Sequence, residues 1–202
     1  MEELAPLLRR IRACALCEAN LPLGPRPVLQ AHAAARILIV GQAPGRKVHE
    51  TGIPFNDPSG ERLRDWLGVS RDQFYNERLF AIVPTGFCYP GKGKSGDLPP
   101  RPECAATWRA PLMAALPNIQ LTVALGQYAH HYHFSGARRS VTERVQLWRD
   151  SWPEIVPLPH PSPRNIGWLQ RNAWFEHELL PVLRRRIHAI LDRSVGEPAN
   201  SL

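Results

Sequence analysis

Four cysteines form the clearest set of chemically reactive residues in this chain of 202 residues. Two lie three positions apart, and the other two flank a long segment rich in Gly, Pro and Lys: Cys14, Cys17, Cys88 and Cys104. The first residues lack the apolar stretch of a secretory signal, so we expect a cytoplasmic protein, where structural disulfides are rare. Four thiolates fit either a [4Fe–4S] cluster or a tetrahedral zinc ion, and residue chemistry alone does not separate the two.

Two other segments place polar side chains in rigid, turn-forming surroundings. The first segment has the sequence Gly41-Gln42-Ala43-Pro44-Gly45. The second has the sequence His160-Pro161-Ser162-Pro163-Arg164-Asn165. Each follows an apolar stretch, and a third unusual segment begins at Pro84 after another such stretch. In parallel α/β sheets, ligands bind beyond the carboxyl ends of the strands, so we expect these three segments to form one site.

Short apolar stretches alternate with helical patterns along the chain. We expect strands at residues 36–41, 79–83, 119–125 and 155–158, and helices at residues 61–67, 104–116, 127–134 and 174–191. Residues 85–102 are predicted to form a long loop. Alternating strands and helices indicate an α/β fold, a three-layer α/β/α arrangement around a central four-stranded parallel sheet. We expect one domain over residues 1–194 and a flexible tail at 195–202.

The charge balance is basic, with 25 Lys and Arg against 18 Asp and Glu and a net charge of +7. This excess suits a polyanionic partner, and it equally fits a basic protein without one. No run approaches the roughly 18 apolar residues needed to cross a membrane, so we expect no membrane association. We expect the protein to act as a monomer.

Together, the two motifs resemble those of the uracil-DNA glycosylase superfamily. Residues 41–45, followed by Gly52-Ile53-Pro54-Phe55 and Gly60, resemble the iron–sulfur branch, family 4, which reads G-E-A-P-G and then G-x-P-F-x-x-x-x-G. The segment from His160 resembles the single-strand-selective monofunctional uracil glycosylases. The likeness covers about residues 12–190. It implies excision of a flipped base from DNA, and the four-cysteine pattern implies a [4Fe–4S] cluster, with zinc as the alternative.

The resemblance also implies roles for individual residues. His160 would donate from a neutral imidazole to the departing base anion, with Gln42 as the second catalytic residue. The base-binding residues would be Gly41, Ala43, Phe55 and Asn56, with Phe55 stacking on the base. The DNA-binding residues would be Pro161, Ser162, Pro163, Arg164 and Asn165, with Arg164 at the position of a wedge or a phosphate contact. Basic and aromatic residues in and just after the predicted long loop fit either contact with a DNA strand or a solvated loop. They are Lys92, Lys94, Arg101 and Trp108.

Three positions depart from the family pattern. Ala43 stands where the classical branch has a water-positioning Asp, and Gln42 stands where family 4 usually has Glu. Gln cannot carry the negative charge that stabilises an oxocarbenium, so His49 and Glu50 are either substitutes for it or exposed loop residues. Pro84 replaces the Asn with which relatives read uracil. Thr85, Asn56 or Asn165 would have to supply that contact from another direction.

Three functions follow from these features. The first is a monofunctional DNA glycosylase of base excision repair that removes uracil or another deaminated base. The second is a catalytically inactive iron–sulfur protein that binds DNA with a glycosylase fold, which the three departures favour. The third is a related enzyme acting on RNA or a free nucleotide. The target base is left open by Pro84.

Overall fold

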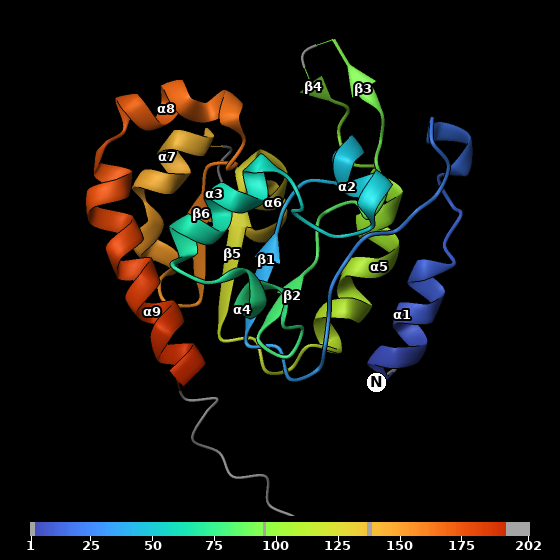
Figure 1. The fold of residues 1–202 in the computed structure, drawn as a ribbon, viewed down its shortest axis with the longest axis horizontal. Coiled ribbons are helices and arrows are strands. Elements are labelled where there is room, and N and C mark those ends of the chain that lie inside the picture. Colours follow the sequence, from blue (N-terminus) through green and yellow to red (C-terminus); the bar gives the residue numbers. More distant parts are fainter. Residues whose placement is uncertain (1–2, 95, 137–138, 193–202) are drawn as a thin grey trace, which may run out of the picture.

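Four parallel strands form the central sheet, in the spatial order β2–β1–β5–β6 (Figure 1). The computed structural model describes residues 3–94, 96–136 and 139–192. In spatial order the strands span Phe80–Ile82, Ile37–Val40, Leu121–Leu125 and Ile155–Leu158. Ile37 is in register with both Phe80 and Leu121, and Leu125 with Leu158. The predicted four-stranded parallel sheet is confirmed.

Helices cover both faces of this sheet, because successive side chains of a strand point to opposite sides. Ile37 and Ile39 of β1 pack into one apolar core, while Leu38 and Val40 pack into the other. The first core is covered by α3 (Pro58–Leu67), α4 (Arg71–Tyr75), α7 (Val141–Gln146) and α9 (Leu180–Asp192). The second is covered by α1 (Leu4–Arg12), α5 (Pro102–Ala114) and α6 (Gly126–His133). The three-layer α/β/α prediction is therefore confirmed.

The segment predicted as a loop at residues 85–102 contains a short antiparallel hairpin instead. Its strands are β3 (Lys92–Gly93) and β4 (Gly96–Asp97), and the hairpin projects from the body near α2 (Arg46–Thr51) in Figure 1. Strands of two residues have no alternation of polar and apolar side chains, so no sequence pattern marked them. The predicted helix at 174–191 begins with a π-helical turn, Phe175–Leu179, before α9.

Helix α3 begins where a side chain satisfies its first backbone donors. The carboxylate of Asp57 caps the helix by accepting from the N–H of Gly60 at 2.9 Å, and Pro58 occupies the first turn. The remaining helical segments are α8 (Ile166–Arg171) and the 3₁₀ turns Glu18–Asn20, Trp148–Ser151 and Pro163–Asn165. Among the described residues, no helix is long and apolar enough to cross a membrane. The predicted tail at 195–202 lies outside the described residues.

Candidate active site

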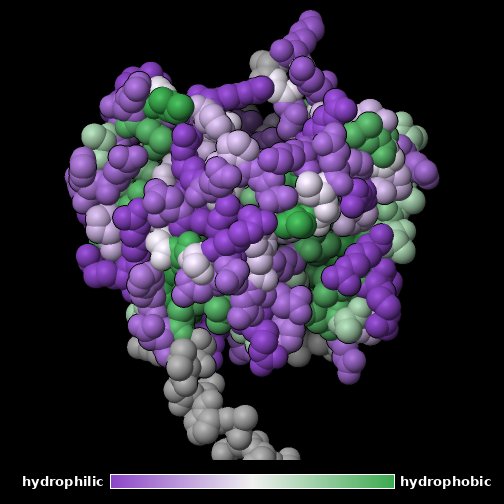
Figure 2. Space-filling view, in the orientation of Figure 1, coloured by the Kyte–Doolittle hydropathy of each residue, from purple (hydrophilic) through white to green (hydrophobic). Residues whose placement is uncertain are grey.

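A pocket of about 720 Å³ lies beyond the carboxyl ends of β1, β2 and β6. Its lining includes Gly41, Pro84 and His160, one from each of the three segments that we expected to meet. The hairpin β3–β4 contributes Gly93, Gly96 and Asp97 to another wall. Figure 2 shows a hollow beneath this hairpin with hydrophilic residues around its rim. The sheet therefore brings the predicted loops to one cavity.

The loop after β1 is tied to the loop after β2. The hydroxyl and the N–H of Thr85 both donate to the carbonyl of Gly41, at 2.8 and 2.9 Å. The N–H of Gly86 donates to the carbonyl of Gln42 at 2.8 Å. Gln42 and Ala43 both line the pocket. Thr85 thus holds the loop, which removes its hydroxyl proton as a candidate donor to a bound base.

Phe55 reaches the pocket through an unusual backbone conformation. Its φ is +53°, in the left-handed region that a bulky residue rarely adopts. Two glycines make room for it: the Phe55 ring would lie 3.3 Å from a Cβ at position 41, and a Cβ at position 60 would overlap its carbonyl. The hydroxyl of Tyr75 also donates to the carbonyl of Pro54 at 2.9 Å. Strain held in place by packing is common at functional sites.

His160 is half-buried, lines the pocket, and is held by its own loop. Its Nδ1 accepts from the N–H of Ser162 at 3.2 Å, so a neutral ring carries its proton on Nε2. The side-chain amide of Asn165 donates to the carbonyl of His160 at 2.7 Å. Arg62 donates to the carbonyls of Pro161 and Ser162 at 3.3 and 3.1 Å. Burial lowers the pKa of His160, while the charge of Asp57 partly opposes that shift.

The rest of the predicted DNA-binding segment divides between the pocket and its outer side. Ser162, Arg164 and Asn165 line the pocket, whereas Pro161 and Pro163 do not. Nη1 of Arg164 lies against Gly96 in the hairpin, where an added side chain would collide with it. Arg164 also faces Asp97, whose pKa is raised by burial and lowered in part by the Arg164 charge. The segment of residues 160–165 (the wedge loop, named for the predicted role of Arg164) and the hairpin therefore meet at the pocket.

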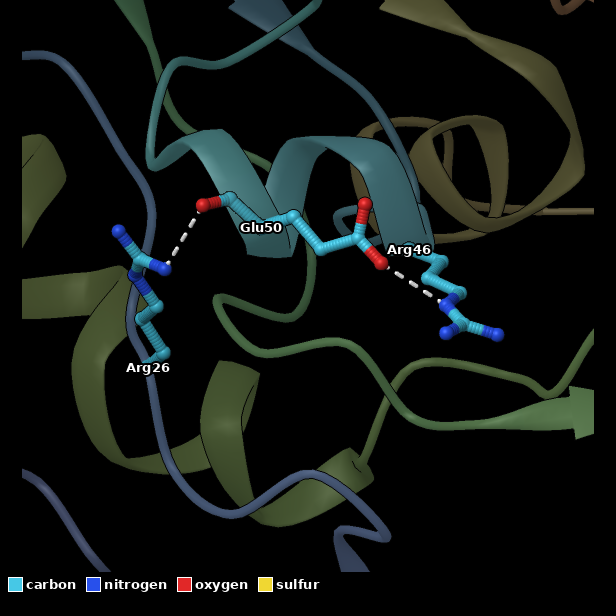
Figure 3. Close-up of polar contacts among 3 residues, drawn as sticks. All are labelled: Arg26, Arg46 and Glu50. Atoms are coloured by element: carbon cyan, nitrogen blue, oxygen red, sulfur yellow. Dashed lines mark hydrogen bonds and ion pairs between the residues drawn. The ribbon is translucent and has the colours of Figure 1, made fainter.

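Two residues considered as substitutes for the missing carboxylate lie elsewhere. Glu50 lies on α2, where it pairs with Arg46 at 2.9 Å and its carbonyl accepts from Arg26 at 3.0 Å (Figure 3). His49 is buried, and this burial lowers its pKa. Neither side chain lines the pocket. Asn56, predicted to bind the base, does not line it either, and its side-chain oxygen accepts from Arg71 at 3.1 Å.

Several pocket residues carry no signal in the family motifs. These are Asp57 at the start of α3, Asp97 on the hairpin, and Gln127 and Tyr128 at the start of α6. The Asp57-Pro58 dipeptide is a helix-start pattern, so its carboxylate is easily assigned to capping alone.

Pro84 also lines the pocket, directly after the carbonyl of Val83 that accepts from buried Arg109 at 3.0 Å.

The four cysteines line a second, smaller cavity. The N–H of Phe87 donates to the Sγ of Cys104, and the indole N–H of Trp108 donates to the Sγ of Cys14, both at 3.3 Å. Burial raises the pKa of Cys104 to about 12 and also raises that of Cys88. Trp108 is buried in α5, so both interpretations of this residue, contact with a DNA strand and a solvated loop, are wrong.

Cys14, Cys17, Cys88 and Cys104 are the residues that would hold a metal group here, either a [4Fe–4S] cluster or a zinc ion. Within the described ranges, no three Cys, His, Asp or Glu side chains are grouped closely enough to hold a metal ion. The N–H groups of Phe87 and Trp108 would serve as donors to ligating sulfurs, a contact that tunes such clusters.

The fold and these loops define an α/β protein with a ligand pocket at the carboxyl edge of a parallel sheet. The chain belongs to the uracil DNA glycosylase superfamily, whose family model matches residues 30–184. It is 28% identical over 170 residues to the Type-4 uracil-DNA glycosylase of Thermotoga maritima, covering 80% of this chain and 83% of that relative. The motif-based assignment to the superfamily is confirmed.

Proposed function

We propose that this protein is a DNA glycosylase of base excision repair. It hydrolyses the N-glycosidic bond of uracil, or of another deaminated base, that has been flipped out of DNA. The observation that carries the proposal is the position of His160 in the pocket, with Nδ1 occupied by Ser162 and a proton on Nε2. Membership of the superfamily and the similarity to a Type-4 uracil-DNA glycosylase support it.

His160 acts as a hydrogen-bond donor to the departing base. When the bond between C1′ and the base nitrogen breaks, the electron pair moves onto the base, and negative charge develops on its carbonyl oxygen. The Nε2–H of a neutral His160 stabilises that charge. One such donor contributes on the order of 2.7–4 kcal/mol to the transition state. A lowered pKa keeps His160 neutral at physiological pH, so no proton need be lost before it donates.

Phe55, Gly41 and Ala43 form the wall against which the base lies. The ring of Phe55 offers a stacking surface, worth about 1–3 kcal/mol per base. Gly41 allows the ring to approach, since its missing Cβ is the atom that Phe55 would meet at 3.3 Å. Gln42 supplies a side-chain amide in place of the family's carboxylate. Asn56 does not contact the base, because its side chain does not line the pocket.

The segment from Pro161 to Asn165 contacts DNA around the extruded nucleotide. Pro161 and Pro163, outside the pocket, stiffen the loop. Arg164 lies at the pocket mouth beside the hairpin, where it can occupy the gap left by the flipped base or contact a phosphate. Ser162 and Asn165 hold His160 in place. The net charge of +7 supports DNA as the partner.

The four cysteines hold a [4Fe–4S] cluster in this proposal. When bound, the cluster supplies a rigid four-point anchor rather than a reacting group. Gly86 lines the cysteine cavity and also donates to the carbonyl of Gln42, so it links the cysteine cavity to the loop after β1. Anaerobically purified protein should contain about four irons per chain. Stoichiometric zinc without iron would contradict the assignment.

Pro84 supports one competing function, a cluster-bearing protein that binds DNA without cleaving it. Proline has no side-chain amide, so the edge of a uracil finds no partner at this position. Ala43 and Gln42 also favour this competing function.

A single domain over residues 1–194, a monomeric state and a cytoplasmic location stay predictions from the sequence.

One assay separates these functions. Oligonucleotides containing uracil, hypoxanthine or xanthine, in single and double strands, are incubated with excess protein, and abasic sites are measured. We expect release of at least one base and a loss on the order of 10²–10³ in rate for His160→Ala. DNA binding without release of any base would favour the inactive protein.

A further inference from the structure

The pocket contains a carboxylate that the family motifs do not supply. Gln42 and Ala43 leave the first motif without a negative charge, and Glu50 and His49 lie outside the pocket. Two acidic side chains do line it: Asp57, from the start of α3, and Asp97, from the hairpin. An oxocarbenium-like sugar needs a nearby negative charge, so these two are the candidates.

Asp57 is the better placed of the two. Its Oδ1 accepts from the N–H of Gly60 at 2.9 Å, which fixes the carboxylate, and no hydrogen bond among the described residues reaches Oδ2. It is the N-cap residue of a ten-residue helix, so its position is set by the start of α3. Its charge is also felt by His160, since it raises the pKa of that ring against the larger effect of burial.

Asp97 has a different environment. Burial raises the pKa of Asp97, and the nearby charge of Asp57 raises it further. Arg164 and Lys92 act in the opposite direction on the same carboxyl. Asp97 therefore lies within the electrostatic influence of these two cations, where the hairpin meets the wedge loop. Its surroundings suit closure of the pocket rather than stabilisation of a sugar cation.

We propose that Asp57 is a catalytic residue that supplies the negative charge and accepts the proton of the attacking water. This inference rests on the proposed glycosylase function. The bond between C1′ and the base nitrogen breaks, and its electron pair leaves with the base. A lone pair of water forms the new C1′–O bond, and Asp57 takes the proton that this water loses. The base anion is then protonated by solvent, which leaves an abasic sugar and a neutral base.

The test separates charge from helix capping. Asp57→Asn removes the charge but keeps a capping oxygen, because Asn is as good an N-cap as Asp. Asp65→Asn is the matched control, since it removes the same charge from an exposed position of the same helix. Single-turnover release of the base and DNA affinity are measured for each variant, with thermal melting as the check on folding.

We expect Asp57→Asn to lower the rate by on the order of 10²-fold or more, within the range for proton transfer by a positioned side chain. DNA affinity should stay the same or increase, because a negative charge near phosphates is lost. Asp65→Asn should keep the wild-type rate. Equal rates in Asp57→Asn and wild type would overturn the inference, as would a loss confined to Asp97→Asn. Absence of base release by the wild type would instead refute the proposed function.

A second variant guards against indirect effects. Asp57→Gly keeps an acceptable N-cap and opens a space beside the pocket. Added formate should restore part of its rate and leave the rate of wild type unchanged, because the anion can occupy the position of the lost carboxylate. Wild-type rate in Asp57→Gly without formate, or no response to formate in a folded and slow variant, would count against the role.

Discussion

The backbone N–H of Ser162 donates to Nδ1 of His160 over 3.2 Å, and this contact decides what the imidazole offers to a ligand. With Nδ1 accepting, the proton of the neutral ring lies on Nε2. Asn165 fixes the backbone of the same residue through its carbonyl, at 2.7 Å. The loop thus orients the Nε2–H of His160 as a donor, provided that the ring stays neutral.

The protonation state of His160 leads to a prediction about pH. Burial lowers the pKa of His160, so the ring stays neutral as the pH falls through its ordinary value of about 6.5. The base-release rate should therefore stay nearly constant across that value. Rates are measured under single turnover, with NMR titration of the ring as the companion measurement. A rate that rises together with protonation of His160 would show that the imidazolium, not the neutral ring, is the donor.

Removal of the Asn165 amide should loosen the His160 loop. Asn165→Ala loses the donor to the His160 carbonyl, so we expect the rate to fall by roughly fivefold, the effect of about 1 kcal/mol of lost positioning. Asn118→Ala is a matched control, because Asn118 makes the same kind of bond, to the carbonyl of Ala33 at 2.9 Å, away from the pocket. Equal losses of activity in the two variants would indicate general destabilisation rather than positioning.

Gly60→Ala should displace Phe55. A Cβ at position 60 would overlap the Phe55 carbonyl, and Phe55 already has a φ of +53°. We expect a loss of about 1–3 kcal/mol in the free energy of unfolding and weaker binding of the flipped base. Gly167→Ala is the comparison, since its Cβ would meet only Nη1 of Arg171 at 3.4 Å. Wild-type stability in Gly60→Ala would mean that the two segments are not in contact.

Buried His130 makes folding stability depend on pH. Its Nε2 lies 3.0 Å from the carbonyl of Leu158 and 3.1 Å from that of Ala124, and burial lowers its pKa to about 4. The unfolded state therefore binds a proton near pH 6.5 that the folded state refuses. Stability is full above that pH and falls between 6.5 and 4, by roughly 3 kcal/mol.

Urea unfolding between these pH values measures the effect. His130→Gln should flatten the acid dependence, because an amide can donate to the carbonyl of Leu158 without titrating. His133 adds to the loss in wild type, since burial also lowers its pKa to about 4. If His130→Gln lost as much folding stability at acidic pH as wild type, a group other than His130 would be responsible for the pH dependence.

Much of the fold could be predicted because the strands are continuous apolar runs. Residues 36–41 and 155–158 correspond to β1 and β6, and the polar segments after them meet in one pocket. The order of residues in the sequence does not show which side chains of a loop face the pocket. Asn56 directly follows the pocket residue Phe55 in sequence, yet its side chain accepts from Arg71 instead of lining the pocket.

Other features had no signal in a single sequence. In sequence, Asp57 has the pattern of a helix cap. Only the position of α3 beside the pocket shows that its carboxylate also lines the pocket. The hairpin that carries Asp97 has strands of two residues, too short for any periodicity. Trp108 lies in a basic segment, and its burial beside Cys14 depends on how α1 packs against α5.

The central claim is that the pocket cleaves an N-glycosidic bond with His160 as the donor to the base. Its most direct test measures free base and abasic sites together, with enzyme in excess over a uracil-containing oligonucleotide, for wild type and His160→Ala. We expect equal amounts of uracil and abasic sites from wild type, and a rate on the order of 10²–10³ lower for the variant. Base release at the same rate by both proteins would contradict this role of His160.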